Sequence, residues 1–299
     1  MWHSCIILSI LLGCALRCST FTLNPEFQGW VGCISHHEVK PILAQKKLAA
    51  KEPVQLQCSI DLGMTETTLL LDKEGVSLNG VDRLATWKEL EKIAKRGTGC
   101  HALYDDGSSP WKISTISEST SIPGSLCPPL QKSGAPTMVL GGFTMHRIAG
   151  DDVDPMVDTR NKLASIKIHP NMRVLDTCMG LGYTAVGAAR LVGQGGGSVT
   201  TIEFDEASLE MCAFNPWSQQ LFDQTVPVEI LLGDSCDLIT GFADATFDCV
   251  IHDPPARALC KSDLYGQQFY NQLFRVLKPR GQMFHYIGNP DSKESGRLY

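Results

Sequence analysis

A loop between residues 176 and 183 has the residue types needed to hold a ligand. Gly180 and Gly182 follow a short apolar run and precede a helical pattern. Glycine lets the backbone turn tightly and approach a ligand with no Cβ in between. The N-terminus of the following helix would direct N–H groups at an anion. A glycine pair alone would also suit a nicotinamide nucleotide or a simple tight turn.

Acidic residues end the next two strand candidates. Glu203 ends the strand expected over 198–204, where an acidic side chain accepts hydrogen bonds from both hydroxyls of a ribose. Asp234 follows the strand expected over 228–232, where an acid can reach an adenine amino group. Either residue alone would be an ordinary polar strand end. Together with the glycine loop, in register at consecutive strand ends, they predict a nucleoside site.

Asp253-Pro254-Pro255 ends the strand expected over 247–252. This tripeptide resembles the Asp/Asn-Pro-Pro-aromatic motif of methyltransferases that act on amino nitrogens of bases or of protein amides. A carboxylate and a proline-fixed carbonyl can hold the two N–H bonds of an amine and orient its lone pair. Methyl transfer is an in-line displacement, so such positioning supplies most of the acceleration. The alternative is a Pro-Pro strand terminator without chemistry.

The constellation over residues 170–290 resembles a class I, Rossmann-like domain of methyltransferases that use S-adenosylmethionine (SAM). The strings 175–185, 215–218, 252–255 and 285–290 are closer still to a family of predicted methyltransferases known mainly from archaea. The resemblance implies SAM as the cofactor and Asp253, Pro254 and Pro255 as catalytic residues. It implies cofactor binding by Asp176, Cys178, Gly180, Gly182, Glu203 and Asp234.

Departures from the pattern give further expectations. Cys178 replaces the usual first glycine of the SAM loop, which predicts a negative φ there. Ala256 stands where base-modifying enzymes place an aromatic ring. Tyr265 or Phe269 could substitute for that ring, or both could be core residues of their helix.

Three histidines and one arginine are also considered as site residues. His146 and Arg147 could contact the substrate or the SAM carboxylate, or could form an exposed pair in a loop. We expect His252 and His285 to be packed strand residues and not acids or bases.

The elements that position these residues alternate strand and helix from residue 172 onward. This rhythm predicts an α/β fold with a parallel sheet and helices on both faces. The expected strands are 173–176, 198–204, 228–232, 247–252 and 282–287, and the expected helices are 184–192, 206–215 and 264–277. The hairpin of strands six and seven of a full class I domain is not visible before residue 299, so we expect a C-terminally truncated methyltransferase domain over 151–299.

The N-terminal part has a different pattern. Residues 1–20 read as a signal or targeting segment, with a mispredicted start or a buried segment as the alternative. Residues 21–53 read as a linker and 54–150 as a small α+β domain, with a boundary loop over 121–136. Within that domain, Thr86 and Glu89 predict a capping box for a helix over 87–95 that ends at Gly97.

Composition limits the class of partner and the compartment. The net charge of −6 gives no strong nucleic-acid footprint, although RNA or protein remains a possible methyl acceptor. No Cys-x-x-Cys pair occurs among 12 cysteines, so no metal site is expected. Scattered cysteines after a signal suggest a reducing organelle and import into a plastid, with the secretory pathway or cytoplasm as alternatives. An aminopropyltransferase of the spermidine-synthase type and a non-catalytic SAM-binding protein are the competing functions.

Overall fold

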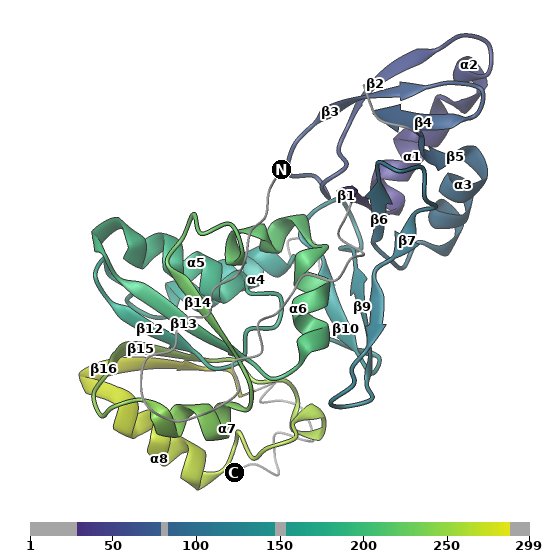
Figure 1. The fold of residues 1–299 in the computed structure, drawn as a ribbon. Coiled ribbons are helices and arrows are strands. Elements are labelled where there is room, and N and C mark those ends of the chain that lie inside the picture. Colours follow the sequence, from purple (N-terminus) through teal and green to yellow (C-terminus); the bar gives the residue numbers. More distant parts are fainter. Residues whose placement is uncertain (1–28, 79–82, 147–153, 288–299) are drawn as a thin grey trace. The chain divides into compact units, whose positions relative to one another are not determined.

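The computed structural model describes residues 29–78, 83–146 and 154–287 (Figure 1). The chain divides into two compact units: unit 1 comprises residues 1–158 and 207–222, and unit 2 comprises residues 159–206 and 223–299. The expected targeting segment over 1–20, Arg147 and the last residues, 288–299, lie outside the described part. Within that part, no helix is both long and apolar enough to cross a bilayer.

Unit 2 is built on a five-stranded parallel sheet, as the sequence predicted. Its strand order is β14-β13-β12-β15-β16. The central strands are buried on both faces, which explains why they read as nearly continuous apolar runs. The strands are β12 (Arg173–Asp176), β13 (Ser198–Glu203), β14 (Val228–Leu232), β15 (Phe247–His252) and β16 (Leu277–His285).

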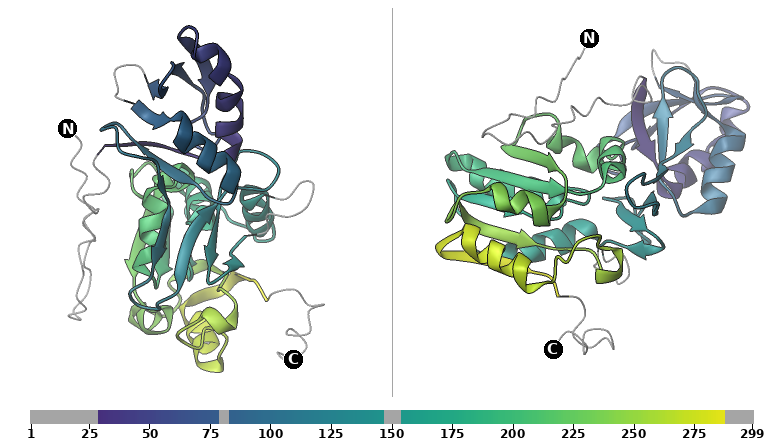
Figure 2. Two further views of the ribbon diagram at one scale, coloured as in Figure 1. Left: turned by 90° about the vertical axis from the view of Figure 1, so that its right-hand side faces the viewer. Right: turned by 60° about the horizontal axis from the view of Figure 1, so that its bottom comes forward.

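Helices cover both faces of this sheet. Figure 1 shows α4 (Pro155–Ala164) and α5 (Tyr183–Val192) on one face, and α7 (Ser235–Leu238) and α8 (Gln267–Val276) on the other. The views in Figure 2 show α8, in yellow, lying along the sheet. Gly187 lets α4 approach α5 closely, because a Cβ there would come 2.5 Å from Leu163 Cδ1. On the opposite face Phe247, Phe269 and Leu273 form a core that is almost fully buried.

Unit 1 contains three antiparallel sheets and the helices that pack on them. Their orders are β1-β6-β7, β2-β3-β4-β5 and β11-β10-β9-β8. The strands are β1 (Trp30–Ile34), β2 (Val54–Cys58), β3 (Thr67–Leu71), β4 (Gly75–Leu78), β5 (Arg83–Thr86), β6 (His101–Tyr104), β7 (Trp111–Lys112), β8 (Ser114–Ile116), β9 (Pro123–Cys127), β10 (Thr137–Leu140) and β11 (Phe143–Thr144). The helices are α1 (His36–Ala44), α2 (Lys46–Ala49), α3 (Trp87–Arg96) and α6 (Glu206–Ala213).

Helix α3 begins and ends as predicted. Thr86 and Glu89 form the reciprocal capping box, and Gly97 ends the helix in the left-handed conformation with φ 63°. Trp87, Leu90 and Ile93 face the core, so the helix is held by an apolar stripe as well as by its caps.

The segment expected to be a linker differs in the structure. Residues 30–49 form β1, α1 and α2, and Val39 and Ile42 are buried in the core of unit 1. Helix α1 is short and contains an internal Pro41, which hid its helical period. Its Ser35–Glu38 capping box is the sequence signal that we missed. Likewise, the expected boundary loop over 121–136 contains strand β9.

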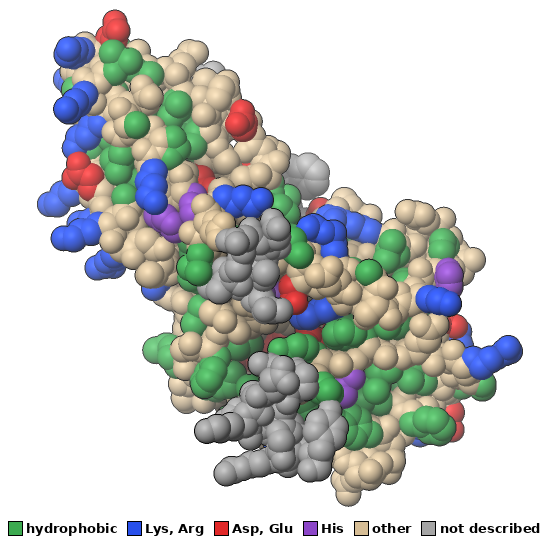
Figure 3. All heavy atoms as spheres, turned by 180° about the vertical axis from the view of Figure 1, so that it is seen from behind, with side chains coloured by type: hydrophobic (Ala, Val, Ile, Leu, Met, Phe, Trp, Pro, Cys, Tyr) green, Lys and Arg blue, Asp and Glu red, His purple; other side chains and the backbone are tan. Residues whose placement is uncertain are grey.

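The basic side chains of this region lie on helices of unit 1. Lys88, Lys92 and Lys95 are exposed on α3, and Lys40 and Lys47 are exposed on α1 and α2. Figure 3 shows Lys and Arg side chains gathered over this part of the molecule, at the upper left. These lysines therefore belong to a folded, charged surface of unit 1.

Candidate active site

The predicted site residues of unit 2 gather at the carboxyl edge of the parallel sheet. Strands β12 and β15 are neighbours, and β13 lies on the other side of β12. The chain therefore reverses its direction of strand addition between β12 and β15. In open α/β sheets ligands bind outside the carboxyl ends of the strands at such a point. The loop after β12, the end of β13 and the motif after β15 all lie there.

The glycine loop has the backbone conformation that its residues predicted. Gly180 and Gly182 have φ values of +54° and +73°, whereas Cys178 is not among the residues with positive φ. A Cβ added at Gly180 would meet no atom within 4 Å, so there is open space beside this turn. The N-cap residue of helix α5 is Gly182, which has no side chain of its own that could cap the helix. The loop therefore fits a ligand with an anionic group beside the helix N-terminus.

Glu203 ties the end of β13 to this loop. Its Oε2 accepts the Gly180 N–H at 2.9 Å, and its Oε1 accepts the Asp205 N–H at 2.9 Å. The side chain is 8% exposed. Each carboxylate oxygen can accept more than one hydrogen bond, so these contacts are compatible with a ribose hydroxyl at the same group.

Asp176 lies beneath the loop. It is fully buried, and its Oδ2 accepts hydrogen bonds from the hydroxyls of Thr201 at 3.0 Å and Thr184 at 3.3 Å. Burial raises the pKa of Asp176 to about 7, and the nearby charge of Asp253 raises it as well. In this position Asp176 holds the base of the loop together.

Asp234 follows β14 and caps α7. Its side chain accepts the N–H of Cys236 at 2.8 Å. This contact fixes the direction of the carboxylate at the edge of the sheet, where the sequence placed it.

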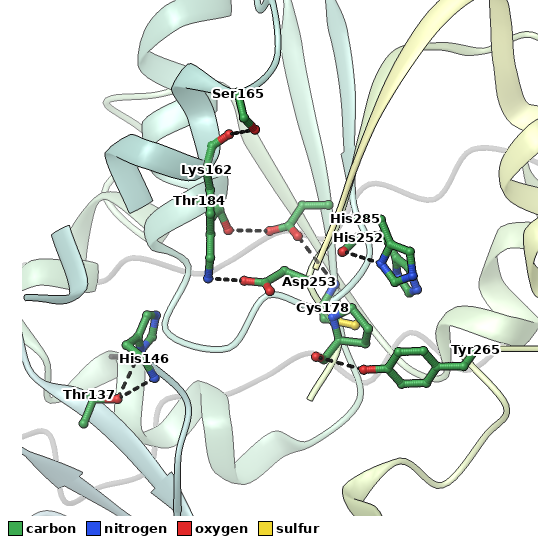
Figure 4. A network of polar contacts seen from close by, with 12 residues as sticks. Thr137, His146, Lys162, Ser165, Cys178, Thr184, His252, Asp253, Tyr265 and His285 are labelled. Carbon is green, nitrogen blue, oxygen red and sulfur yellow. Dashed lines mark hydrogen bonds and ion pairs between the residues drawn. The ribbon is translucent and has the colours of Figure 1, made fainter. Parts of the chain in front are cut away.

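Asp253 forms an ion pair that the sequence did not predict. Its Oδ2 lies 2.6 Å from Lys162 Nζ, and the two side chains are 19% and 10% exposed. Figure 4 shows the Lys162 amine pointing at the Asp253 carboxylate from helix α4. The two residues are far apart in the chain, and no local pattern links them, so only the fold brings them together.

Tyr265 is the aromatic residue that reaches the motif. Its hydroxyl donates to the Pro255 carbonyl at 2.9 Å and lies 3.5 Å from the Pro254 carbonyl (Figure 4). Burial raises the pKa of the Tyr265 phenol, which keeps it a donor. Phe269 is buried in the core of unit 2, which agrees with the alternative that it is a core residue of its helix. Tyr265 therefore fixes the backbone after Asp253.

His252 and His285 are packed residues, as expected. His252 is fully buried; its Nδ1 lies 2.7 Å from Thr177 Oγ1, and its Nε2 lies 3.0 Å from the Leu264 carbonyl. Burial lowers the pKa of His252 to about 3, and His285 lowers it further. The ring is therefore neutral, with Nε2–H donating to the carbonyl and Nδ1 accepting from the threonine. His285 Nε2 lies 2.9 Å from the hydroxyl of Tyr270.

His146 belongs to unit 1. Its backbone N–H donates to Thr137 Oγ1 at 3.0 Å, and its Nδ1 lies 3.2 Å from the same oxygen. Arg147, predicted as its partner at the substrate, lies outside the described residues. A substrate role for this pair remains a prediction.

These features define a class I methyltransferase fold whose sheet edge fits a nucleoside, and the comparisons with known proteins agree on the methyltransferase domain. Residues 175–285 match the family described as "Methyltransferase domain". The "Uncharacterized protein MJ1233" of Methanocaldococcus jannaschii is 36% identical over 254 residues, which are 84% of this chain and 82% of that protein.

Solved structures show partial likenesses. A SAM-dependent methyltransferase from Aquifex aeolicus shares 24% identity over 41% of this chain and 59% of that one, with a TM-score of 0.32. A spermidine synthase from Thermotoga maritima shares 18% identity over 62% of this chain and 60% of that one, with a TM-score of 0.46. This chain thus spans about three fifths of each of these solved chains, and neither likeness carries a conclusion about activity.

The chain therefore belongs to the family of the M. jannaschii protein MJ1233, and its residues 175–285 form a methyltransferase domain with a class I, Rossmann-like fold. S-adenosylmethionine is the cofactor of this class. The open space at Gly180, the glycine N-cap of α5 and the buried Glu203 carboxylate fit it.

Proposed function

We propose that this protein methylates an amino nitrogen, of an RNA base or of a protein amide, held by Asp253 and the backbone of Pro254 and Pro255. The observation that carries the proposal is the position of this tripeptide. It ends β15, the strand directly beside β12, whose following loop is the glycine turn. A group that holds an acceptor and a loop that holds a nucleoside therefore meet at adjacent strand ends.

Each cofactor-binding residue is assigned to a different part of SAM. Gly180, Gly182 and Cys178 form the turn beside the cofactor, with the start of α5 directed at its carboxylate. Glu203 accepts hydrogen bonds from the ribose hydroxyls, and Asp234 reaches the adenine amino group. Asp176 supports the turn from below through the hydroxyls of Thr184 and Thr201.

The acceptor residues orient a lone pair. When bound, SAM supplies a methyl group activated by its sulfonium. The Asp253 carboxylate and a carbonyl of the proline pair accept the two N–H bonds of the acceptor, which leaves the nitrogen lone pair pointing along the transfer direction. Asp253 also offers a place for the proton that the nitrogen loses. Tyr265 keeps the Pro255 carbonyl in position. The rate enhancement comes from the orientation of the acceptor nitrogen relative to the methyl group.

An experiment with labelled SAM tests this proposal. Purified protein is incubated with SAM carrying a tritiated methyl group and with RNA or protein fractions from cells, beside an Asp253→Ala control. We expect label in one fraction, recovered after hydrolysis as an N-methyl base or amide, and none with the control. Label recovered as an O-methyl or C-methyl product contradicts the proposal. SAM binding with no transfer to either fraction favours a non-catalytic SAM-binding protein.

A further inference from the structure

The Lys162–Asp253 pair places a fixed positive charge at the acceptor motif. Lys162 Nζ lies 2.6 Å from Asp253 Oδ2, and the lysine side chain is only 10% exposed. The same ammonium lies 5.5 Å from the centre of the Tyr286 ring, so an aromatic face covers it as well. A charge held in this way is screened little by salt.

We propose that Lys162 determines the class of acceptor: it rejects cationic amines and restricts the site to an uncharged amino nitrogen. This inference rests on the acceptor role proposed for Asp253. A cationic amine bound to the same carboxylate would lie about 5 Å from the lysine ammonium, where like charges in a partly buried site weaken binding by about tenfold to a hundredfold. The amino group of a base or an amide has no charge and avoids this penalty.

The position of the pair separates this role from that of a structural ion pair. Unit 2 has a second lysine–aspartate pair on β15, in which Lys278 Nζ lies 2.8 Å from Asp248. Asp248 is near the amino end of the strand, and Asp253 follows its carboxyl end. The Lys278 pair therefore has the same chemistry at the end of the sheet away from the motif. It provides a matched control for any effect of net charge or of strand anchoring.

The inference also separates methyl transfer from aminopropyl transfer. A polyamine acceptor carries several positive charges and needs carboxylates without bound cations. Here the carboxylate of the motif is already neutralised by Lys162. The site thus favours the proposed function over the spermidine-synthase alternative.

The test is a calorimetric titration of putrescine into protein saturated with S-adenosylhomocysteine. We compare wild-type protein with Lys162→Gln, whose uncharged amide can still donate to Asp253, and with Lys162→Arg and Lys278→Gln. Lys162→Gln is expected to bind putrescine about tenfold more tightly than wild type or more, because the repulsion is gone. Lys162→Arg and Lys278→Gln are expected to match wild type. Adding Asp253→Asn to Lys162→Gln should abolish the gain.

Two results overturn the inference. One is a folded Lys162→Gln protein that binds S-adenosylhomocysteine but gains no affinity for putrescine. The other is an equal gain in Lys278→Gln, which would show an effect of net charge. By contrast, wild-type protein that does not bind S-adenosylhomocysteine contradicts the proposed function itself.

A second measurement does not depend on the folding of a variant. Ligand-observed NMR on the wild-type complex compares butyramide, which is uncharged, with n-butylamine, which is cationic. We expect the amine to bind about tenfold more weakly than the amide. Tighter binding of the amine would overturn the role of Lys162.

Discussion

The Glu203 carboxylate accepts the backbone N–H of Gly180 at 2.9 Å, which joins the end of β13 to the turn after β12. The carboxylate that we assign to the ribose thus also shapes the glycine loop. Its second oxygen holds the N–H of Asp205, so the group is fixed from both sides. A fixed acceptor loses little conformational freedom when a ligand binds.

Replacing Glu203 by Gln should weaken SAM binding. Glutamine keeps one acceptor oxygen but replaces the other with an NH2 group. This NH2 group cannot accept a hydrogen bond from the backbone N–H or the ribose hydroxyl that it faces. We expect a loss of about 1–3 kcal/mol in SAM binding free energy, measured by calorimetry. Glu229→Gln, at an exposed position of β14, is the matched control and should bind as wild type does. Equal affinity in the two variants would remove Glu203 from the cofactor site.

Asp176 should make the folded protein less stable as the pH rises from about 4 to 7. Burial raises its pKa from 3.8 to about 7, so in this range the native state keeps a proton that the unfolded state has lost. Stability therefore falls with increasing pH through this window. Above it, both states have lost the proton, so this group causes no further change of stability with pH. Asp176→Asn does not titrate, so its Tm should fall less than that of wild type between pH 5 and pH 8. Parallel Tm curves would show that the carboxyl is not buried as described.

His252 should make the folded protein less stable as the pH falls below 6.5. Its pKa is lowered from 6.5 to about 3, so the native state stays neutral while the unfolded state takes up a proton. The stability contributed by the neutral ring is present above pH 6.5 and is lost as the pH falls towards 3. His252→Gln should be less stable than wild type at pH 8, since two buried hydrogen bonds change, but less sensitive to acid. A steeper loss of Tm in acid for His252→Gln would contradict this account.

Tyr265→Phe should lower kcat and leave SAM affinity unchanged. The variant loses the hydrogen bond to the Pro255 carbonyl, so the backbone after Asp253 is held less firmly. We expect a fall in kcat of about three- to tenfold, from the loss of one neutral hydrogen bond. Tyr270→Phe, whose hydroxyl contacts His285 and not the motif, is the control and should keep its kcat. A fall in Tm with kcat intact would make Tyr265 a structural residue only.

The parallel sheet and the positions of most candidate site residues could be predicted from the sequence because their signals are local. Strands β12, β14 and β15 contain short apolar runs, and Gly180, Gly182 and Asp253 lie in contiguous motifs at strand ends. The turn geometry also agrees with residue type, since a side chain at Cys178 disfavours the left-handed conformation that Gly180 and Gly182 adopt.

Other features depend on contacts between distant segments. The Lys162–Asp253 pair joins α4 to the end of β15, and nothing near Lys162 in the chain marks it. The burial of Asp176 arises from the threonines of α5 and β13 that cover it. Helix α1 was missed because Pro41 interrupts its sequence pattern, whereas packing of Val39 and Ile42 in the core of unit 1 stabilises it.

The most direct test of the account is to measure SAM affinity and turnover together in the Asp253→Ala variant. Asp253 is assigned to the acceptor and not to the cofactor, and alanine removes the oxygen that accepts the N–H of the acceptor, which asparagine would keep. We predict that calorimetry gives a SAM affinity close to that of wild type, while transfer of the labelled methyl group to the acceptor fraction is lost. A parallel loss of SAM binding, or turnover that survives the substitution, would contradict the role of Asp253 in holding the acceptor nitrogen.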